Sequence, residues 1–386
     1  MKTKYFSKLF LLVMAFILVA AGCTTVTTSQ SKVLTVGVFG PLTGGMAVGG
    51  THQKEGIEYA IQKINTAGGL CDGKYSLAAI FADTEGNPEN AVTIMNKFLY
   101  KDNVIATMGS NNSPEVLAVL DLIAKAKTPH IVPSGVAMAI TASGNEWVSR
   151  ITASDYVFTK RSAEFAVKTL GHSKIAILCD TNDYGSGGTK LLEQYLSEMG
   201  VTPVLKDSFS TGTKDFTAQL LKIKEANVEA LIIWANYTEV GQLVRQMSEL
   251  GIKNLDVILS TGATIGNFFE LAGATANGMY GVMSGFSPAR TDKTAVDFMA
   301  EYEKFYSRKP DINDVLAYDA VNVLAEAIKN TCTEDHALLQ KAIRSIKDFP
   351  GVSGTITFAE NGEGGTNALM IKIVDGVNKT TELVGN

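Results

Sequence analysis

The chain has 386 residues, of which 46% are hydrophobic and 19% charged, and its formal net charge at pH 7 is −5. An acidic chain without a cluster of lysines and arginines argues against a nucleic-acid partner, and this hydrophobic content argues against intrinsic disorder. The length suggests about two domains of roughly 150 residues each.

The first two dozen residues have the pattern of an export signal. Three lysines precede an apolar run over 9–21, which is shorter than the ~20 apolar residues of a spanning helix. The small residues before Cys23 resemble the lipobox of bacterial lipoproteins, although Leu18 lies two positions earlier than the leucine of that motif. We therefore expect a lipoprotein signal peptide at 1–22, lipidation of Cys23 and a flexible tether at 23–32. An ordinary cleaved signal with an incidental cysteine is the alternative.

Strand-like and helix-like segments then alternate along the chain. In the first half, apolar or β-branched runs predict strands at 34–39, 75–81, 104–108 and 130–132. Between them, helical spacing of apolar residues predicts helices around 57–64, 88–98 and 115–126.

The alternation restarts in the second half. Strands are predicted at 174–178, 230–234, 257–260, 355–358 and 369–374, and helices around 191–199, 240–250, 294–306 and 315–329. Such alternation predicts parallel sheets covered by helices on both faces. The fold class is therefore α/β, with two doubly wound lobes joined by a hinge of several crossovers.

Three cysteines follow Cys23, at Cys71, Cys179 and Cys332. An exported compartment permits disulfides. A bond between Cys71 and Cys332 is possible if both fall in one lobe. Cys179 ends an apolar strand and is expected to be a buried free thiol.

Several short motifs together resemble the branched-chain amino-acid type of periplasmic binding protein, between 33 and 374. The matching segments are Gly40–Gly44, Glu55–Gly56, Ile64–Gly69, Asn87–Pro88, Lys214–Phe216, Ala317–Ala320 and Gly354–Phe358. The resemblance implies the type I fold, two Rossmann-like lobes with the ligand in the cleft between them. It places 33–153 and 287–360 in the N-terminal lobe and 154–286 and 361–386 in the C-terminal lobe.

The loop after strand 104–108 is the first candidate for ligand binding, because doubly wound sheets bind ligands beyond the carboxyl ends of their strands. Ser113 suits a helix N-cap and Pro114 the first helical position. The helix start offers free N–H groups and a positive dipole end to a carboxylate. The resemblance implies that Ser113 binds the ligand carboxylate, with Asn112 beside it.

Further candidates come from the other loops at these strand ends. The resemblance implies ligand contacts from Ser134, Gly135, Val136, Tyr184, Asn236, Thr261 and Tyr318. The two tyrosines would form an aromatic wall, which suits an amphipathic molecule.

The partners of a ligand ammonium are missing from this set. Val136 stands where the resembled proteins have a threonine, and Thr261 stands where they have a carboxylate. A buried ammonium without a counter-charge costs several kcal/mol. Either Asp155, Asp183 or Glu239 takes over this role, or the ligand has no ammonium.

An enzyme is not expected. The glycine-rich segment 185–190 has a lysine at the sixth place, where a dinucleotide fingerprint needs glycine, and lacks the Gly-Lys-Ser/Thr order of a P-loop. The histidines at 52, 130, 172 and 336 have no partners at metal-ligand spacing. No catalytic residue, metal or other cofactor is predicted.

The resulting hypothesis is an extracytoplasmic, lipid-anchored solute-binding component of an ABC transporter. Its expected partners are a small hydrophobic amino acid of the branched-chain type, the permease subunits, and the membrane through the anchor. Two alternatives stay open. The ligand is an aromatic or short carboxylic acid or amide without an ammonium, or the protein is a ligand receptor for membrane signalling.

Overall fold

The computed structural model describes residues 31–385, so the predicted signal peptide, Cys23 and most of the predicted tether lie outside the described residues. The first strand begins at Lys32, inside the predicted tether. Within the described part, no helix has the length and apolar content needed to cross a membrane.

The first lobe is built on a parallel sheet with the strand order β2-β1-β3-β4-β5. The strands are β1 (Lys32–Gly40), β2 (Tyr75–Asp83), β3 (Ala106–Met108), β4 (His130–Val132) and β5 (Val148–Arg150). The helices that follow these strands are α1 (Ala47–Thr66), α2 (Pro88–Tyr100), α3 (Ser113–Ala126) and the short α4 (Ala139–Ala142). Three later helices share their core with β1 and α1, and these are α10 (Lys293–Tyr306), α11 (Ile312–Thr331) and α12 (His336–Ser345).

The second lobe contains a seven-stranded sheet with the order β14-β13-β10-β9-β8-β6-β7. Its parallel strands are β6 (Ile175–Asp180), β7 (Leu205–Phe209), β8 (Ala230–Trp234), β9 (Asp256–Leu259) and β10 (Tyr280–Ser284). The antiparallel strands β13 (Ala368–Asp375) and β14 (Thr380–Val384) complete one edge. The helices of this lobe are α5 (Asp155–Glu164), α6 (Asp183–Glu198), α7 (Thr217–Ala226), α8 (Tyr237–Glu249) and α9 (Phe268–Ala272).

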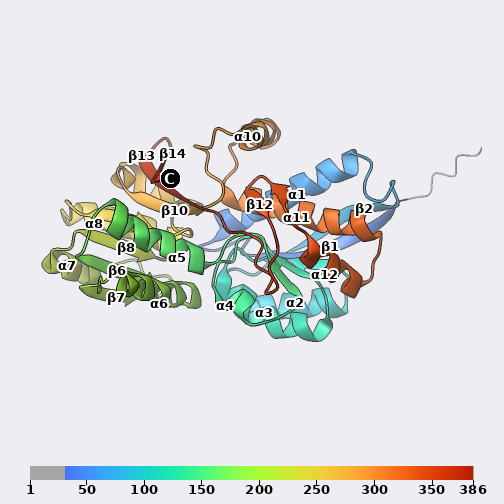
Figure 1. Cartoon of the computed structure of the whole chain (residues 1–386), viewed down its shortest axis with the longest axis horizontal. Coiled ribbons are helices and arrows are strands. Elements are labelled where there is room, and N and C mark those ends of the chain that lie inside the picture. Colours follow the sequence, from blue (N-terminus) through green and yellow to red (C-terminus); the bar gives the residue numbers. More distant parts are fainter. Residues whose placement is uncertain (1–30, 386) are drawn as a thin grey trace, which may run out of the picture.

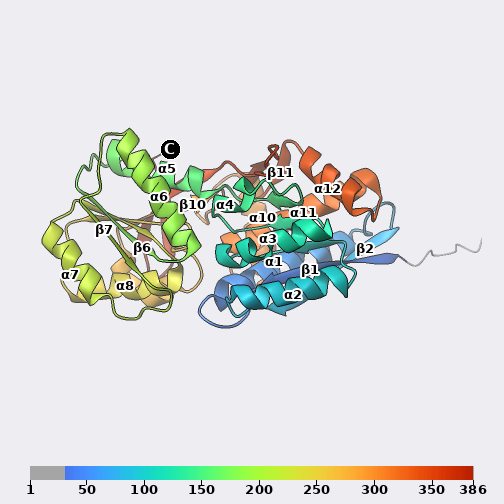
Figure 2. The same cartoon turned by 90° about the horizontal axis from the view of Figure 1, so that it is seen from below.

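The two lobes lie side by side along the long axis of the molecule (Figures 1 and 2). The described chain passes between the sheets after β5, after β10 and before β13. A small hairpin of β11 (Phe349–Gly351) and β12 (Gly354–Ile356) precedes the last passage. The architecture is the type I periplasmic binding protein fold, which confirms the predicted fold class.

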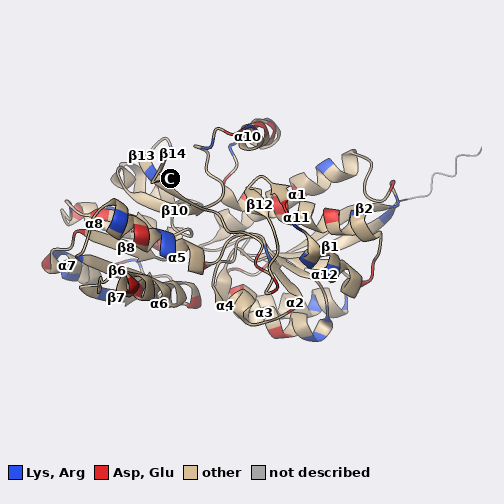
Figure 3. Cartoon of the chain, viewed as in Figure 1, with Lys and Arg blue, Asp and Glu red and all other residues tan. Residues whose placement is uncertain are grey.

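Local sequence explains why these elements form where they do. All residues of β6 and of β8 are buried, as expected for central parallel strands covered on both faces. Helix α2 begins as predicted, because Asn87 accepts a bond from the N–H of Glu89 and Pro88 occupies the first turn. Lys, Arg, Asp and Glu are spread over both lobes (Figure 3), in keeping with a chain that has no basic cluster.

The glycine-rich segment 185–190 has a packing role. Its glycines lie inside α6. A Cβ at Gly185 would lie 2.1 Å from the carbonyl oxygen of Asp180, and one at Gly188 would lie 2.1 Å from Nε1 of Trp234. These glycines therefore let α6 approach β6 and β8 closely.

Cys71 and Cys332 form a disulfide, with their Cα atoms 5.9 Å apart and 261 positions between them in the sequence. Cys179 is a buried free thiol in β6. The disulfide that the sequence left open as a possibility is therefore present, and the expectation of a buried free thiol at Cys179 is confirmed.

Candidate functional site

A cavity of about 40 Å³ lies between the lobes. It faces the carboxyl ends of β3 and β4 in the first lobe and of β6, β8 and β9 in the second. Seven of the nine predicted ligand-binding residues line it, namely Asn112, Ser113, Ser134, Val136, Tyr184, Asn236 and Thr261. Gly135 and Tyr318 do not line it. Ligands bind at this position in doubly wound sheets, so the cavity is the candidate site.

Ser113 lies at the start of α3, but one position further into the helix than predicted. Asn112 is the N-cap residue and Ser113 the first residue of the helix. The Ser113 hydroxyl oxygen is 3.2 Å from the backbone nitrogens of Val136 and Ala137 and accepts both N–H groups. Since a hydroxyl also donates one hydrogen, the proton of Ser113 stays available to an acceptor in the cavity.

The loop 134–137 is held from behind by Arg150, which sequence reasoning missed. This side chain is 0% exposed and donates to the carbonyls of Gly135 and Ala137, at 3.3 and 2.8 Å. Glu363 pairs with the guanidinium and compensates its charge. Arg150 is therefore a positioning residue, and the carbonyl of Gly135 is turned toward it.

The second lobe contributes Tyr184, Asn236 and Thr261. The Tyr184 hydroxyl accepts the N–H of Gly262 at 3.1 Å and lies 3.3 Å from the hydroxyl of Thr261. Burial raises the pKa of Tyr184 well above its usual range, so the phenol stays neutral. This wall is polar at its edge and aromatic on its face.

Helix α11 supplies a third wall through Ile312, Asn313 and Leu316. Tyr318 lies two residues beyond Leu316, about 200° around a helix of 3.6 residues per turn. Its ring instead packs near Phe298 and Tyr59, with ring centroids 4.9 and 5.8 Å apart. The predicted aromatic wall therefore has one tyrosine at this cavity.

Among residues 31–385, no ionisable carboxylate, amine, guanidinium or imidazole lines the cavity. Asp183 is exposed, and Glu239 accepts the N–H of Gly212 at 2.9 Å. Asp155 is buried and is not one of the lining residues, and burial raises the pKa of its carboxyl well above the usual range. Asp155, Asp183 and Glu239, the three candidate partners of a ligand ammonium, are therefore not lining residues of the cavity.

The lobes also contact each other beside the cavity. The N–H of Gly49 donates to the hydroxyl of Tyr237 at 3.2 Å, and the hydroxyl of Thr238 donates to the carbonyl of Gly45 at 2.6 Å. Tyr237 and Thr238 begin α8, whereas Gly45 and Gly49 flank the start of α1. These two bonds, which we call the interlobe latch, join the lobes without passing through the cavity.

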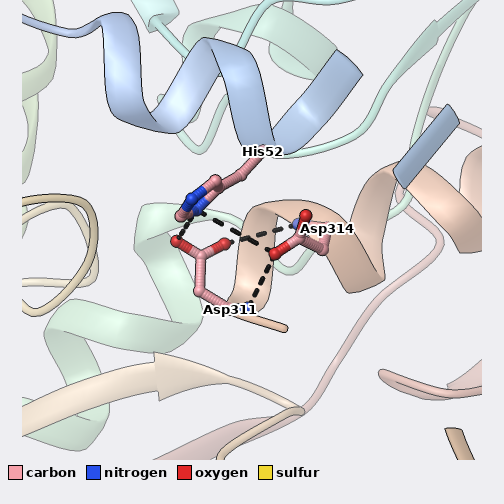
Figure 4. A group of neighbouring side chains, drawn as sticks. All are labelled: His52, Asp311 and Asp314. Carbon is pink, nitrogen blue, oxygen red and sulfur yellow. Dashed lines mark hydrogen bonds and ion pairs between the residues drawn. The ribbon is translucent and has the colours of Figure 1, made fainter. Parts of the chain in front are cut away.

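A separate cluster joins His52 to Asp311 and Asp314 (Figure 4). The imidazole Nδ1 of His52 lies 2.6 Å from a carboxylate oxygen of Asp311 and 3.9 Å from one of Asp314. Arg308 donates to both oxygens of Asp314, at 2.8 and 2.7 Å. Because this guanidinium already neutralises Asp314 and would repel a cation, the cluster acts as an ion-pair network at the capping box of α11.

The His52 pair predicts a pH dependence of stability. Burial alone would lower the pKa of His52, but the charge and hydrogen bond of Asp311 outweigh it and raise the pKa. The stabilisation is therefore complete below about pH 6.5, the ordinary value for histidine, and is lost as the pH rises through the higher folded-state pKa. In the wild type, we expect the free energy of unfolding to fall by about 1 kcal/mol or less as the pH rises above that value. His52→Gln should abolish this fall, and urea denaturation at a series of pH values measures it.

The control for this prediction is His336→Gln. The neighbour of the His336 ring is an uncharged group, the Thr128 hydroxyl at 3.4 Å, and not a carboxylate. An unchanged pH profile in the His52 variant would contradict the assignment.

Comparisons with known proteins identify the family of the chain. The family model described as "Periplasmic binding protein" matches residues 33–378. A Leu/Ile/Val-binding protein homologue of Brucella melitensis is 28% identical over 331 residues, covering 86% of this chain and 88% of the relative.

Solved structures are similar over most of the chain. A branched-chain amino-acid transporter substrate-binding protein of Streptococcus pneumoniae, in complex with isoleucine, has a TM-score of 0.83 and 26% identity and covers 92% of this chain and 99% of its own. A solute-binding protein of an ABC transporter from Rhodopseudomonas palustris, in complex with 3,4-dihydroxybenzoic acid, has a TM-score of 0.81 and 22% identity, with coverages of 89% and 94%. At that identity the second likeness shows the fold alone.

Proposed function

The chain belongs to the family of periplasmic binding proteins, and from that premise we propose that it captures a small solute between its lobes and delivers it to the permease of an ABC transporter. Members of the family are substrate-binding components of transporters rather than enzymes, and the family implies an extracytoplasmic location. The observation that carries the proposal is the cavity at the strand ends of both lobes, with the Ser113 hydroxyl at the start of α3.

Closure of the lobes is the proposed mechanism. The polar end of the solute meets the Ser113 hydroxyl and the first N–H groups of α3. Its apolar part then packs against Tyr184, Ile265 and Leu316, which come from both lobes. Enclosure strengthens the polar contacts by excluding water and produces a shape that a permease distinguishes from the open form.

Two ligand classes are candidates. A branched-chain amino acid is the class that the names of several relatives state. A ligand without an ammonium, such as an aromatic or short carboxylic acid or an amide, is favoured by one specific observation. In the described part of the chain, no acidic side chain belongs to the lining. We prefer the second class, because desolvating an ammonium with no counter-charge costs more than a small site returns.

The attachment to a membrane is part of the proposal. The sequence before Cys23 supports lipidation of that residue, which would hold the protein beside its permease. A receptor role in membrane signalling is the alternative use of the same ligand-driven closure.

Replacing Ser113 by alanine tests the site. We expect the affinity for a bound solute to fall by about 1–3 kcal/mol, because one buried hydrogen bond is lost. Isothermal calorimetry with leucine, its deaminated analogue 4-methylpentanoate and the matching amide measures the change. Ser197→Ala, at an exposed position of α6, is the control. Equal affinities of the Ser113 variant and the wild type for every solute that binds would count against this cavity.

A further inference from the structure

Resting on the function proposed above, we propose that the polar group of the solute is uncharged and both donates and accepts hydrogen bonds, as a carboxamide or a urea does. We assign its recognition to Asn111 and Asn313, two cavity residues that the sequence analysis did not select.

The two asparagines come together from distant parts of the chain. Asn111 lies in the loop between β3 and α3, and Asn313 lies in the first turn of α11. A Cβ at Gly49 would lie 2.5 Å from Nδ2 of Asn111 and 3.4 Å from Nδ2 of Asn313. The missing side chain therefore leaves room for both amide nitrogens beside the start of α1, and both asparagines belong to the lining of the cavity.

Neither asparagine side chain has a hydrogen-bond partner among the described residues. Within residues 31–385, the side-chain oxygen and nitrogen of Asn111 and of Asn313 are shielded from solvent and have no hydrogen-bond partner. Asn313 as a whole is only 1% exposed. The hydroxyl of Ser134, another lining residue, is also shielded and unpartnered. Buried polar groups are normally paired, so these atoms point to a partner that a ligand supplies.

The chemistry of the two amides selects the kind of partner. Each offers one acceptor oxygen and one donor NH₂ group. A carboxylate only accepts, so it would leave both asparagine oxygens unpaired and face them with its negative charge. An ammonium only donates, and none of the described lining residues offers it a carboxylate. A carboxamide or a urea pairs with both kinds of atom.

The nearby charges do not alter this conclusion. Arg150, behind the loop 134–137, is paired with Glu363, and Asp155 is buried outside the lining. The apolar side chains around the cavity are Met46, Val136, Ile265, Met283, Ile312 and Leu316. With a volume of about 40 Å³, the cavity suits an amide with a short apolar part.

Calorimetry with matched compounds tests the inference on the wild-type protein. The probes are 4-methylpentanamide, 4-methylpentanoate and leucine, which share a carbon skeleton, together with acetamide and urea. We expect at least one uncharged probe to bind about tenfold or more tightly than either charged probe, since a site built for mutual hydrogen bonds rejects groups that leave its atoms unpaired. Tighter binding of leucine or 4-methylpentanoate, or no binding of any uncharged probe, overturns it.

The Ser113→Ala variant separates this failure from that of the proposed function. If a charged probe binds best and the variant weakens that binding, the inference falls and the solute-binding cavity stands. If the variant binds every probe as the wild type does, the proposed site itself is wrong.

Asn313→Asp tests the residue assignment. The substitution keeps the size of the side chain but replaces its donor and adds a negative charge. We expect the affinity for the uncharged probe to fall about tenfold or more. Asn330→Asp, the same change at an exposed position of α11, should leave it unaltered. Thermal melting checks the folding of both variants, and unchanged affinity in a folded Asn313→Asp protein overturns the assignment. The wild-type comparison remains decisive if that variant does not fold.

Discussion

Removing the disulfide by Cys71→Ser together with Cys332→Ser is expected to lower the free energy of unfolding by up to about 5 kcal/mol. The bond joins residues 261 positions apart, and a cross-link over so long a loop restricts the unfolded chain strongly. It ties the segment after α1 to the end of α11, two helices that pack on each other in the core of the first lobe. Urea denaturation under oxidising conditions measures the loss.

Reduction provides the control for this experiment. A reductant should destabilise the wild type by a similar amount and leave the double variant unaffected. If thiol titration shows a fully reduced wild type that unfolds at the same urea concentration as before, the stabilising role of the disulfide is refuted.

Asp319→Ala is expected to destabilise the protein by roughly 3–5 kcal/mol, because several buried bonds to one carboxylate are lost together. Asp319 is 1% exposed and accepts the N–H groups of Val352 and Ser353, at 2.9 and 2.8 Å, and the Ser353 hydroxyl at 2.6 Å. Burial raises the pKa of Asp319 to about 6, so the group is ionised at neutral pH. These hydrogen bonds connect α11 to the turn between β11 and β12.

Asp319→Asn is the matched comparison, since it keeps the shape and one acceptor oxygen. We expect about half the loss, measured by the same urea titration. A loss below about 1 kcal/mol in the alanine variant would show that the hairpin is held by other contacts. The resemblance detected in the sequence includes Asp319, and this structural role explains its place in the motif without any contact with a ligand.

The elements with strong local signals could be predicted from the sequence. The buried strands β6 and β8 are continuous apolar runs, and α2 carries its cap and proline in sequence order. β7 escaped prediction because it is an edge strand whose residues alternate between partly covered and exposed positions. Its sequence, LKDSF, contains few of the residues that mark a strand.

The site was predictable only where a loop and its neighbouring strand lie together in the sequence. Ser113, Ser134 and Tyr184 follow predicted strands, and all three line the cavity. Asn313 and Arg150 reach their places through tertiary packing. Asn313 arrives on a helix from the far end of the chain, and Arg150 lies at the end of β5 rather than in the loop it holds. No local pattern marks either residue.

The interlobe latch implies that solute affinity is partly decided by residues that never touch the solute. Gly49 with Tyr237, and Gly45 with Thr238, contribute to the free-energy difference between the separated and the joined lobes. The apparent dissociation constant equals the intrinsic one divided by the fraction of molecules in the competent arrangement. Substitutions at these two contacts can therefore change the solute concentration that uptake requires. They would leave unchanged which solute the cavity binds.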